Sequence, residues 1–469
     1  MSGRSIAPGP LRRRQLLALA AALGAASCAR TPDLRDYLAG DDGRLKRAIL
    51  GSRNPLSQTE RGALLASLPP AESEDALRRQ LVLQRALSQE PLVEGNNVRL
   101  LRDGSGAFPV MFRAIATARD HINMEFFILQ DVEWSGTRLS DLLVERMQRG
   151  VAVNIIYDAF GSADTPAVLF DRLRKAGARI VEFNPLNPLV ARTDWRPNHR
   201  DHRKILVVDG RIGFTGGINF DKVYQNPPSA GVPADGNLEH AYWRDTAVRI
   251  EGPAVAGLQR LFFVTWRQQK GPPVAAVRYY PPLPPAGVQT VRIIGSSPTD
   301  DRPLDYISLM TAVLSAERNV WFSTGYFIPP HDEREDLRKT ARAGVDVRFV
   351  LPSHADMAAT ISAARATYGD LLEAGAHIYE MQNAVLHSKL ATIDGVWSVV
   401  GSSNLDRRSV IFNKEVDAVI LGHATASQVE ALLRQDMAES RPITLAGWRQ
   451  RSLRERLEEM KARFWEYWM

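Results

Sequence analysis

From residue 98 onward, short apolar runs alternate with segments of helical spacing, and the whole series occurs twice. In the first half, apolar runs at 98–101, 121–129, 152–157 and 179–183 enclose helix-like segments at 108–119, 138–149 and 168–176. In the second half the runs are 291–294, 320–327, 345–351 and 377–380, again with helix-like segments between them. Alternating strands and helices are typical of a sheet covered by helices on both faces. The pattern predicts an α/β protein of two fused domains with mixed, largely parallel sheets.

A short polar motif lies at the same place in each half. His202, Lys204 and Asp209 recur as His387, Lys389 and Asp394, each 185 residues later (387 − 202 = 185). The same offset relates Gly216 to Gly401, Asn219 to Asn404, and Asp221 to Asp406. A constant register over so many positions indicates duplication of one ancestral unit.

Each copy of the motif is predicted to form a β-hairpin. Asp209-Gly210 and Asp394-Gly395 are turn signals, and the apolar run after each can return antiparallel. Because side chains alternate along a strand, His202 and Lys204 lie on one face and can reach the same ligand. An asparagine follows the returning strand in both copies, Asn219 and Asn404.

These residue types suit chemistry on a phosphate group. Two equivalent histidines can act as nucleophile and as proton donor on opposite sides of one phosphorus atom. Lys204 and Lys389 offer positive charge to phosphate oxygens, and the asparagine amides offer neutral donors. This chemistry needs no metal and no cofactor, and we predict neither. One such hairpin alone would more simply be a surface histidine beside a lysine, but two in common register argue against that interpretation.

Length and composition set the outer limits. The chain has 469 residues, 45% of them hydrophobic and 24% charged, which is typical of a folded protein of two or three domains. Lys and Arg total 59 against 53 Asp and Glu, a net charge of +6. A mild basic excess favours an anionic partner, either a phospholipid surface or nucleic acid.

The N-terminus resembles an export signal. Arg12–Arg14 precede an apolar stretch, Leu16–Ala26, that is too short to cross a bilayer stably. Cys28 stands where a bacterial lipoprotein carries its lipid-acceptor cysteine, although Ala25 occupies a position where leucine is usual. We therefore expect an exported protein on the periplasmic side of a bacterial membrane, with Cys28 as a candidate lipid anchor and ordinary signal cleavage as the alternative. With one cysteine, no intrachain disulfide can form.

The end of the chain combines apolar residues at helical spacing with arginines. Such a helix can lie in a membrane interface or dock onto the protein itself, and both interpretations stay open. A proline-rich stretch that cannot continue a helix or an inner strand separates the halves. The predicted organisation is an export signal (1–28), a helical lead-in (29–92), a first domain (93–270), a linker (271–290), a second domain (291–440) and an amphipathic C-terminal helix (441–469).

The paired H-x-K-x4-D motif resembles the signature of the phospholipase D superfamily, over about residues 93–440. Within it, the chain is most similar to bacterial cardiolipin synthases. The segments that carry this similarity are 198–204, 214–219, 243–246, 249–253 and 401–409, followed by Asn413 and Glu415.

The resemblance implies one active site at the pseudo-twofold interface between the halves. It also implies that a carboxylate downstream of each motif hydrogen-bonds its histidine; these are Asp245 in the first half and Glu415 in the second. His202 would be the nucleophile and His387 the proton donor. Asp209 and Asp394 belong to the catalytic signature, although holding the hairpin turns explains them better than contact with substrate.

The implied activity is transfer of a phosphatidyl group between two phosphatidylglycerol molecules, with release of glycerol. A hydrolytic phospholipase D, which would release phosphatidic acid, is the first alternative, and a phosphodiesterase or nuclease is the second. Nucleic acid is not the expected partner because no basic run interleaved with stacking aromatics precedes the motifs. The expected partners are an anionic phospholipid, phosphatidylglycerol, and a membrane surface, with no obligate protein partner. A catalytically silent lipid-binding lipoprotein is the least favoured class because both motifs are intact.

Overall fold

The computed structural model describes residues 73–87, 90–187, 196–300 and 303–452. The predicted export signal, Cys28 and most of the helical lead-in lie outside these ranges, as does most of the predicted C-terminal helix. The described part of the lead-in contains α5 (Ser73–Leu87), which packs against α10 of the second half. Within the described ranges, no helix combines the length and the apolar character needed to span a bilayer.

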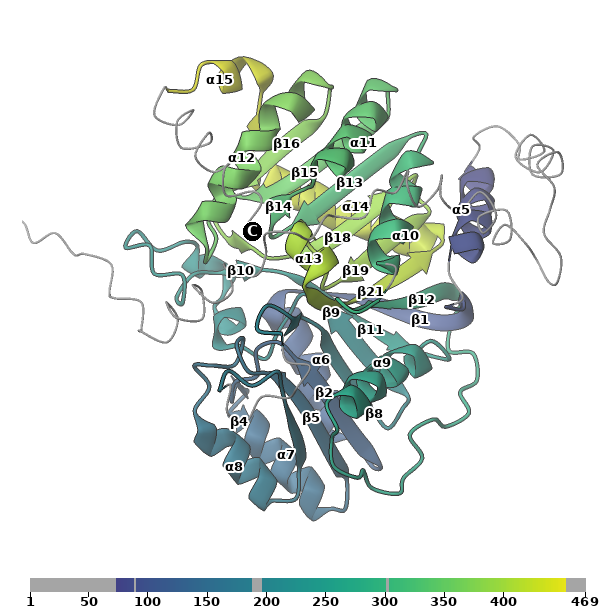
Figure 1. Ribbon diagram of the computed structural model, residues 1–469, viewed down its shortest axis with the longest axis vertical. Coiled ribbons are helices and arrows are strands. Elements are labelled where there is room, and N and C mark those ends of the chain that lie inside the picture. The colour runs from purple at the N-terminus through teal and green to yellow at the C-terminus, as the bar shows by residue number, and fades with distance from the viewer. Residues whose placement is uncertain (1–72, 88–89, 188–195, 301–302, 453–469) are drawn as a thin grey trace, which may run out of the picture.

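The first half follows the predicted alternation closely (Figure 1). Its elements are β1 (Val93–Arg102), α6 (Asp103–Ala116), β2 (His121–Phe126), β3 (Glu133–Trp134), β4 (Thr137–Arg138), α7 (Leu139–Gln148), β5 (Ala152–Asp158), α8 (Ala167–Lys175), β6 (Arg179–Phe183), β7 (Arg200–Asp201), β8 (Lys204–Val208), β9 (Ile212–Gly216), the short 3₁₀ helices η1 (Lys222–Gln225) and η2 (Pro228–Ala230), β10 (Trp243–Arg244), β11 (Thr246–Glu251) and α9 (Val255–Gln268).

The second half repeats this order. Its elements are β12 (Gln289–Ser296), α10 (Leu304–Leu314), β13 (Asn319–Thr324), β14 (Phe327–Ile328), α11 (His331–Arg342), β15 (Asp346–Pro352), α12 (Ala358–Glu373), β16 (His377–Met381), β17 (Val385–Leu386), β18 (Lys389–Ile393), β19 (Trp397–Gly401), β20 (Leu405–Asp406), α13 (Arg407–Ile411), β21 (Asn413–Leu421), α14 (His423–Ala438), β22 (Ser440–Ile443) and α15 (Leu445–Arg449).

The two halves share one continuous 16-stranded sheet, joined where β1 pairs antiparallel with β12. The sheet is mixed, as predicted, but it is less parallel than the sequence suggested. Apart from the short ladder of β7 with β21, parallel pairing within it is confined to β2–β5–β6 and β13–β15–β16. The other ladders of this sheet are antiparallel because each motif hairpin and the strand after it fold directly back on their neighbours.

Helices cover both faces of the sheet, as predicted (Figure 1). One core packs α6, α7 and α8 on the first half, and another packs α10, α11 and α12 on the second. On the opposite face, a third core contains residues of α9 and of α14 together, including Leu258 and Leu433. Because this core crosses the seam between the halves, burial of its apolar surface holds the two motifs in a fixed relation.

The linker and the described start of the C-terminal region pack onto the protein. The Tyr279 ring in the linker lies 4.6 Å from the His121 ring of the first half. Residues 441–443, predicted as the start of a helix, belong instead to the edge strand β22, which pairs antiparallel with β16. Pro442 is compatible with an edge strand, where its missing N–H costs no ladder hydrogen bond. Trp448 of α15 lies 5.1 Å from Tyr368 of α12, so this described part of the tail docks onto the second half.

Candidate active site

The two motif histidines lie just ahead of the strands β8 and β18, and each is held by the other half. The His202 backbone N–H donates to the carbonyl of Lys414 at 3.0 Å, and the His387 N–H donates to the carbonyl of Arg244 at 2.9 Å. Short parallel ladders, β7 with β21 and β10 with β17, extend these contacts. The resemblance implied a site between the halves. The structure shows how the backbone forms it, because each of these short ladders pairs one strand of the first half with one strand of the second.

The carboxylates predicted to orient the histidines do so across the interface. His202 Nδ1 lies 2.9 and 3.0 Å from the two oxygens of Glu415, and His387 Nδ1 lies 2.8 Å from Oδ2 of Asp245. The residue types were predicted correctly, but the pairing of each carboxylate with the histidine of its own half was wrong. The pairs cross because β21 and the β10–β11 segment each reach over the seam, so neither half contains a complete histidine–carboxylate pair.

The two pairs have different surroundings. Glu415 accepts hydrogen bonds from Ser402 Oγ at 2.5 Å and from Asn413 Nδ2 at 3.0 Å. On the other side, the Tyr224 hydroxyl lies 2.9 Å from Asp245 Oδ2 and 3.0 Å from His387 Nδ1. We did not predict a role for Tyr224. Its position in the repeat corresponds to Ser409 (409 − 185 = 224), so the loss of symmetry there was the available signal.

Burial and charge shift the titration of both pairs. Burial, followed by the charges of Lys204 and Lys389, holds the pKa of His202 well below its ordinary value. Burial raises the pKa of Glu415 to about 7. Burial would also raise the pKa of Asp245, but the hydrogen bond and charge of His387 outweigh it and lower the pKa. Burial, followed by the charge of Lys389, also lowers the pKa of His387, although the hydrogen bond and charge of Asp245 oppose this shift. Both shifts favour a neutral ring, but at His387 the ionised carboxylate of Asp245 favours the protonated form.

Both motif lysines are buried beside the histidines. Lys204 Nζ donates to the carbonyl of His202 at 2.6 Å, and Lys389 Nζ donates to the carbonyl of His387 at 2.5 Å. Burial lowers the pKa of Lys204 to about 7 and that of Lys389 to about 8. An anion between them would stabilise both ammonium groups, because an opposite charge favours the charged form.

The two predicted asparagines also lie at the site. Asn219 Oδ1 accepts the backbone N–H of Ile128 at 3.2 Å, which fixes the orientation of its amide. Asn404 is 7% exposed, and its Oδ1 is buried without a hydrogen-bond partner among the described residues. In each side chain, Nδ2 is the atom that can donate to a phosphate oxygen.

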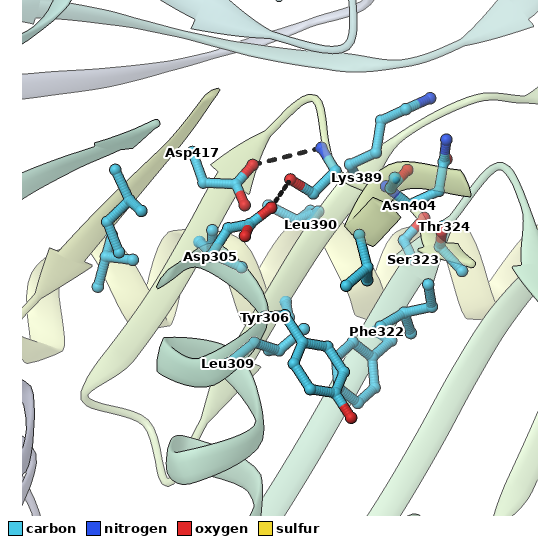
Figure 2. Close-up of a pocket in the computed structure, with 18 of the residues that line it drawn as sticks. Asp305, Tyr306, Leu309, Phe322, Ser323, Thr324, Lys389, Leu390, Asn404 and Asp417 are labelled. Atoms are coloured by element: carbon cyan, nitrogen blue, oxygen red, sulfur yellow. Dashed lines mark hydrogen bonds between the residues drawn. The ribbon is translucent and has the colours of Figure 1, made fainter. Parts of the chain in front are cut away.

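A cavity opens beneath the second motif. Figure 2 shows Lys389 and Asn404 at one end, the carboxylates Asp305 and Asp417 at another, and aromatic side chains below them. Ser403 joins the two acids, since its N–H lies 3.3 Å from Asp417 Oδ1 and its hydroxyl 3.1 Å from Asp305 Oδ2. These bonds hold the turn that carries Asn404. A Cβ on Gly401 would lie 1.7 Å from Asp417 Oδ1, so glycine is required there.

The motif aspartates lie at the other end of each hairpin from the histidines. Asp394 accepts the backbone N–H groups of Glu317, Arg318 and Asn319 at 2.8–3.2 Å. Asp209 accepts those of residues 119–121 in the same way, at 2.8–3.1 Å. Asp209 and Asp394 have positive φ, 55° and 53° respectively, as a type I′ hairpin turn requires. Their inclusion among catalytic residues is not supported by this placement; they hold the hairpin turns, as the sequence analysis favoured.

Replacing Asp394 by alanine should therefore affect stability rather than chemistry. We expect the free energy of unfolding to fall by about 2–4 kcal/mol, since three N–H groups lose a charged acceptor and alanine disfavours positive φ. Denaturant melts would measure this loss. Asp394→Asn is the matched control, because asparagine keeps an acceptor and tolerates positive φ, and its loss should be smaller. A large fall in kcat of folded Asp394→Ala would contradict the structural role.

Among the described residues, no group of three or more His, Cys, Asp or Glu side chains is arranged to hold a metal ion. The chemistry available at the site is that of the two histidines, their carboxylates, the lysines and the asparagine amides.

A duplicated α/β unit that brings two H-x-K motifs together across its interface defines a member of the phospholipase D superfamily. The chain belongs to the family described as "Cardiolipin synthase, PLD-like domain", which it matches over residues 111–226 and 309–437. It is therefore an enzyme of the phosphatidyltransferase class.

Similar proteins cover most of the chain. It is 31% identical to a cardiolipin synthase of Geobacillus sp. (strain WCH70), over 89% of this chain and 81% of the relative. It is 35% identical to cardiolipin synthase A of Pseudomonas aeruginosa (strain LESB58), over 76% and 70% of the two chains. Among solved structures, phosphatidylserine synthase of Haemophilus influenzae Rd KW20 shares the fold, with a TM-score of 0.60 at 13% identity, covering 83% of this chain and 98% of that one.

Proposed function

We propose that this protein forms cardiolipin by transferring a phosphatidyl group from one phosphatidylglycerol molecule to another. The crossed histidine–carboxylate pairs carry the proposal, because they supply two imidazoles in one site, each oriented by a carboxylate at its Nδ1. The names of the relatives support the lipid substrate. The alternative, hydrolysis to phosphatidic acid, uses the same residues and differs only in the acceptor.

In the first step, His202 attacks the phosphorus of the donor lipid. With Nδ1 bonded to Glu415, the neutral ring keeps its lone pair on Nε2, which is the atom left for phosphorus. The bond from phosphorus to the glycerol oxygen breaks, and His387 gives its proton to that oxygen. Glycerol leaves, and the phosphatidyl group remains on His202.

In the second step, the roles of His387 reverse. Its ring, now neutral, takes the proton from a terminal hydroxyl of the second phosphatidylglycerol. The resulting oxygen attacks phosphorus, and the phosphorus–nitrogen bond breaks. Cardiolipin is released, and His202 returns to its free state. One phosphodiester replaces another, so the exchange is nearly isoenergetic and needs no nucleotide. Lys204, Lys389 and the two asparagine amides would stabilise the charge on the phosphoryl oxygens throughout.

The test is product analysis with purified protein and vesicles of labelled phosphatidylglycerol. Cardiolipin and free glycerol are expected in equal amounts, and the His202→Ala protein serves as the blank. Phosphatidic acid alone would exclude the synthase and leave the hydrolase. Absence of turnover would exclude both activities on this lipid.

The dependence of kcat/KM on pH should be bell-shaped and centred near neutrality. Glu415, whose pKa is raised to about 7, must be ionised to hold the His202 tautomer, so activity falls as pH drops below that value. Lys204 and Lys389, whose pKa values are lowered to about 7 and 8, must be charged to hold phosphate, so activity falls as pH rises above them. Initial rates between pH 5 and 10 extend about two pH units beyond the lowest and highest of these pKa values. They would show the fall in kcat/KM on the acid side and on the alkaline side. A rate that keeps rising to pH 10 would contradict the role of the lysines.

We also propose that the protein works on the periplasmic side of a bacterial membrane. The support is the export-type N-terminus, with Cys28 as the candidate lipid anchor, and the lipid nature of the proposed substrate. Cell fractionation of the full chain and of Cys28→Ser would test this: the full chain should be in the membrane fraction. If Cys28 carries the anchor, the variant should be released from it.

A further inference from the structure

A group of basic side chains lies beside His202 at the interface between the halves. We call it the rim cluster, and its members are Arg196, His199, Arg200 and Arg408. The first three precede His202 on the first half, whereas Arg408 belongs to α13 of the second. The Arg408 guanidinium donates to the carbonyl of Asn198 at 3.3 Å, which fixes α13 against the segment that leads to His202. The cluster is thus built jointly by both halves.

The rim cluster breaks the symmetry of the repeat. At the offset of 185 residues that relates the two motifs, its counterparts are uncharged. Arg196, His199, Arg200 and Arg408 correspond to Met381, Ala384, Val385 and Val223, respectively. The backbone at these places remains symmetric, since β7 pairs with β21 as β17 pairs with β10. Folding therefore does not require charges here, and they mark a difference in function between the two sides of the site.

Only part of this charge is neutralised. The Nη1 atom of Arg200 lies 3.6 Å from Oδ1 of Asp158, and the same guanidinium donates to the carbonyl of Pro197. Arg408 is partly buried and has no carboxylate within ion-pair distance among the described residues. Burial, followed by the charges of the three arginines, lowers the pKa of His199 to about 4. A half-buried excess of positive charge is unfavourable by itself and is stabilised by a bound anion.

The cluster is close enough to the reacting centre to matter for substrate. Burial is the first cause of the pKa shifts of His202 and Tyr326, and the charge of Arg408 acts on both. The Arg408 guanidinium bonds the carbonyl of Asn198, four residues before His202, so the cluster lies beside the segment that carries His202. The Tyr326 ring lies 6.2 Å from the His387 ring. A ligand held there would flank the phosphate bound between the histidines.

We propose that Arg408, His199 and Arg196 form a second anion subsite, which binds the phosphodiester of the acceptor lipid. This inference rests on the proposed function. The attacking hydroxyl and the phosphate of phosphatidylglycerol belong to one short headgroup, so an acceptor poised for attack brings a second phosphate next to the first. Water carries no anion and gains nothing from the subsite. The rim cluster thus selects a lipid acceptor over water and separates a synthase from a hydrolase built on the same motifs.

The test compares two acceptors of one phosphatidyl enzyme. Full-length protein and its Arg408→Gln variant are given phosphatidylglycerol vesicles, with and without 1-butanol, a neutral acceptor. We expect the variant to form cardiolipin at least about tenfold more slowly, as for loss of one charge-assisted contact. Formation of phosphatidylbutanol should stay within about twofold, and the share of phosphatidic acid should rise. His199→Gln should shift the products in the same direction and carries the test if the arginine variant does not fold.

The control is Lys222→Gln, which removes one exposed positive charge from the corresponding segment of the other side and should leave all products unchanged. Equal loss of cardiolipin and phosphatidylbutanol would overturn the subsite, because it would assign Arg408 to the shared chemistry. Unchanged products in both rim variants would also overturn it. Failure of the proposed function is distinguishable, since it would appear in the unmodified protein as absence of cardiolipin.

Discussion

Replacing His202 by alanine is expected to lower the rate of phosphatidyl transfer by about 10⁵-fold or more, because the variant loses the group assigned to form the bond to phosphorus. His387→Ala should lower it by about 10² to 10⁴-fold, the usual range for a lost general acid and base. Turnover of labelled phosphatidylglycerol by each purified variant measures both effects. Full activity in either variant would remove the dyad mechanism.

A substrate with a better leaving group separates the two roles. A phosphatidyl p-nitrophenyl ester releases an anion that needs no proton, so the first step should proceed in His387→Ala but not in His202→Ala. The His387 variant should release about one equivalent of p-nitrophenolate and retain the phosphatidyl group on His202, since the second step still lacks its base. If His202→Ala released one equivalent of p-nitrophenolate and His387→Ala released none, His387 would be the nucleophile and His202 the acid.

The crossed pairs predict a second large effect. Asp245→Asn and Glu415→Gln should each reduce transfer by about 10³ to 10⁴-fold, because an amide can no longer hold its histidine in the working tautomer. The p-nitrophenyl ester again distinguishes them. Asp245→Asn should behave like His387→Ala and give a burst, whereas Glu415→Gln should behave like His202→Ala and give none.

This comparison decides between two pairings of the same four residues. If each carboxylate served the histidine of its own half, Asp245→Asn would abolish the burst and Glu415→Gln would keep it. Ser402→Ala removes a neighbour of Glu415 without removing the carboxylate, so it serves as a milder control for changes at that end of the site.

Much of the fold could be predicted from the sequence. The order of strands and helices in both halves follows from local periodicity, and the structure reproduces it from β1 to β16. The hairpin turns were also predictable, because Asp-Gly at 209–210 and 394–395 is a local signal for positive φ. The extent of parallel pairing was not, since strand neighbours in the sheet are set by contacts between distant segments.

The residues of the site could likewise be predicted from the sequence, but their hydrogen-bond partners could not. Register along the repeat identified His202 and His387, and the resemblance to the superfamily implied the carboxylates Asp245 and Glu415. The sequence does not determine whether a carboxylate bonds the histidine of its own half or that of the other half, because both arrangements have the same residue spacing. Tyr224 escaped notice for a related reason: its contact with His387 spans 163 residues and depends on the seam between the halves.

The sequence by itself determined that one unit was duplicated, that each copy carries a histidine, a lysine and an asparagine, and that the copies fold as alternating strands and helices. These properties are local, or repeat at a constant interval, so they survive without coordinates. The tertiary structure decided which atoms meet: histidines bonded to carboxylates of the opposite half, a tyrosine on one pair alone, and an arginine of the second half held against the segment that leads to His202. Such contacts join segments far apart in the chain, and only the packing of the two halves against each other fixes them.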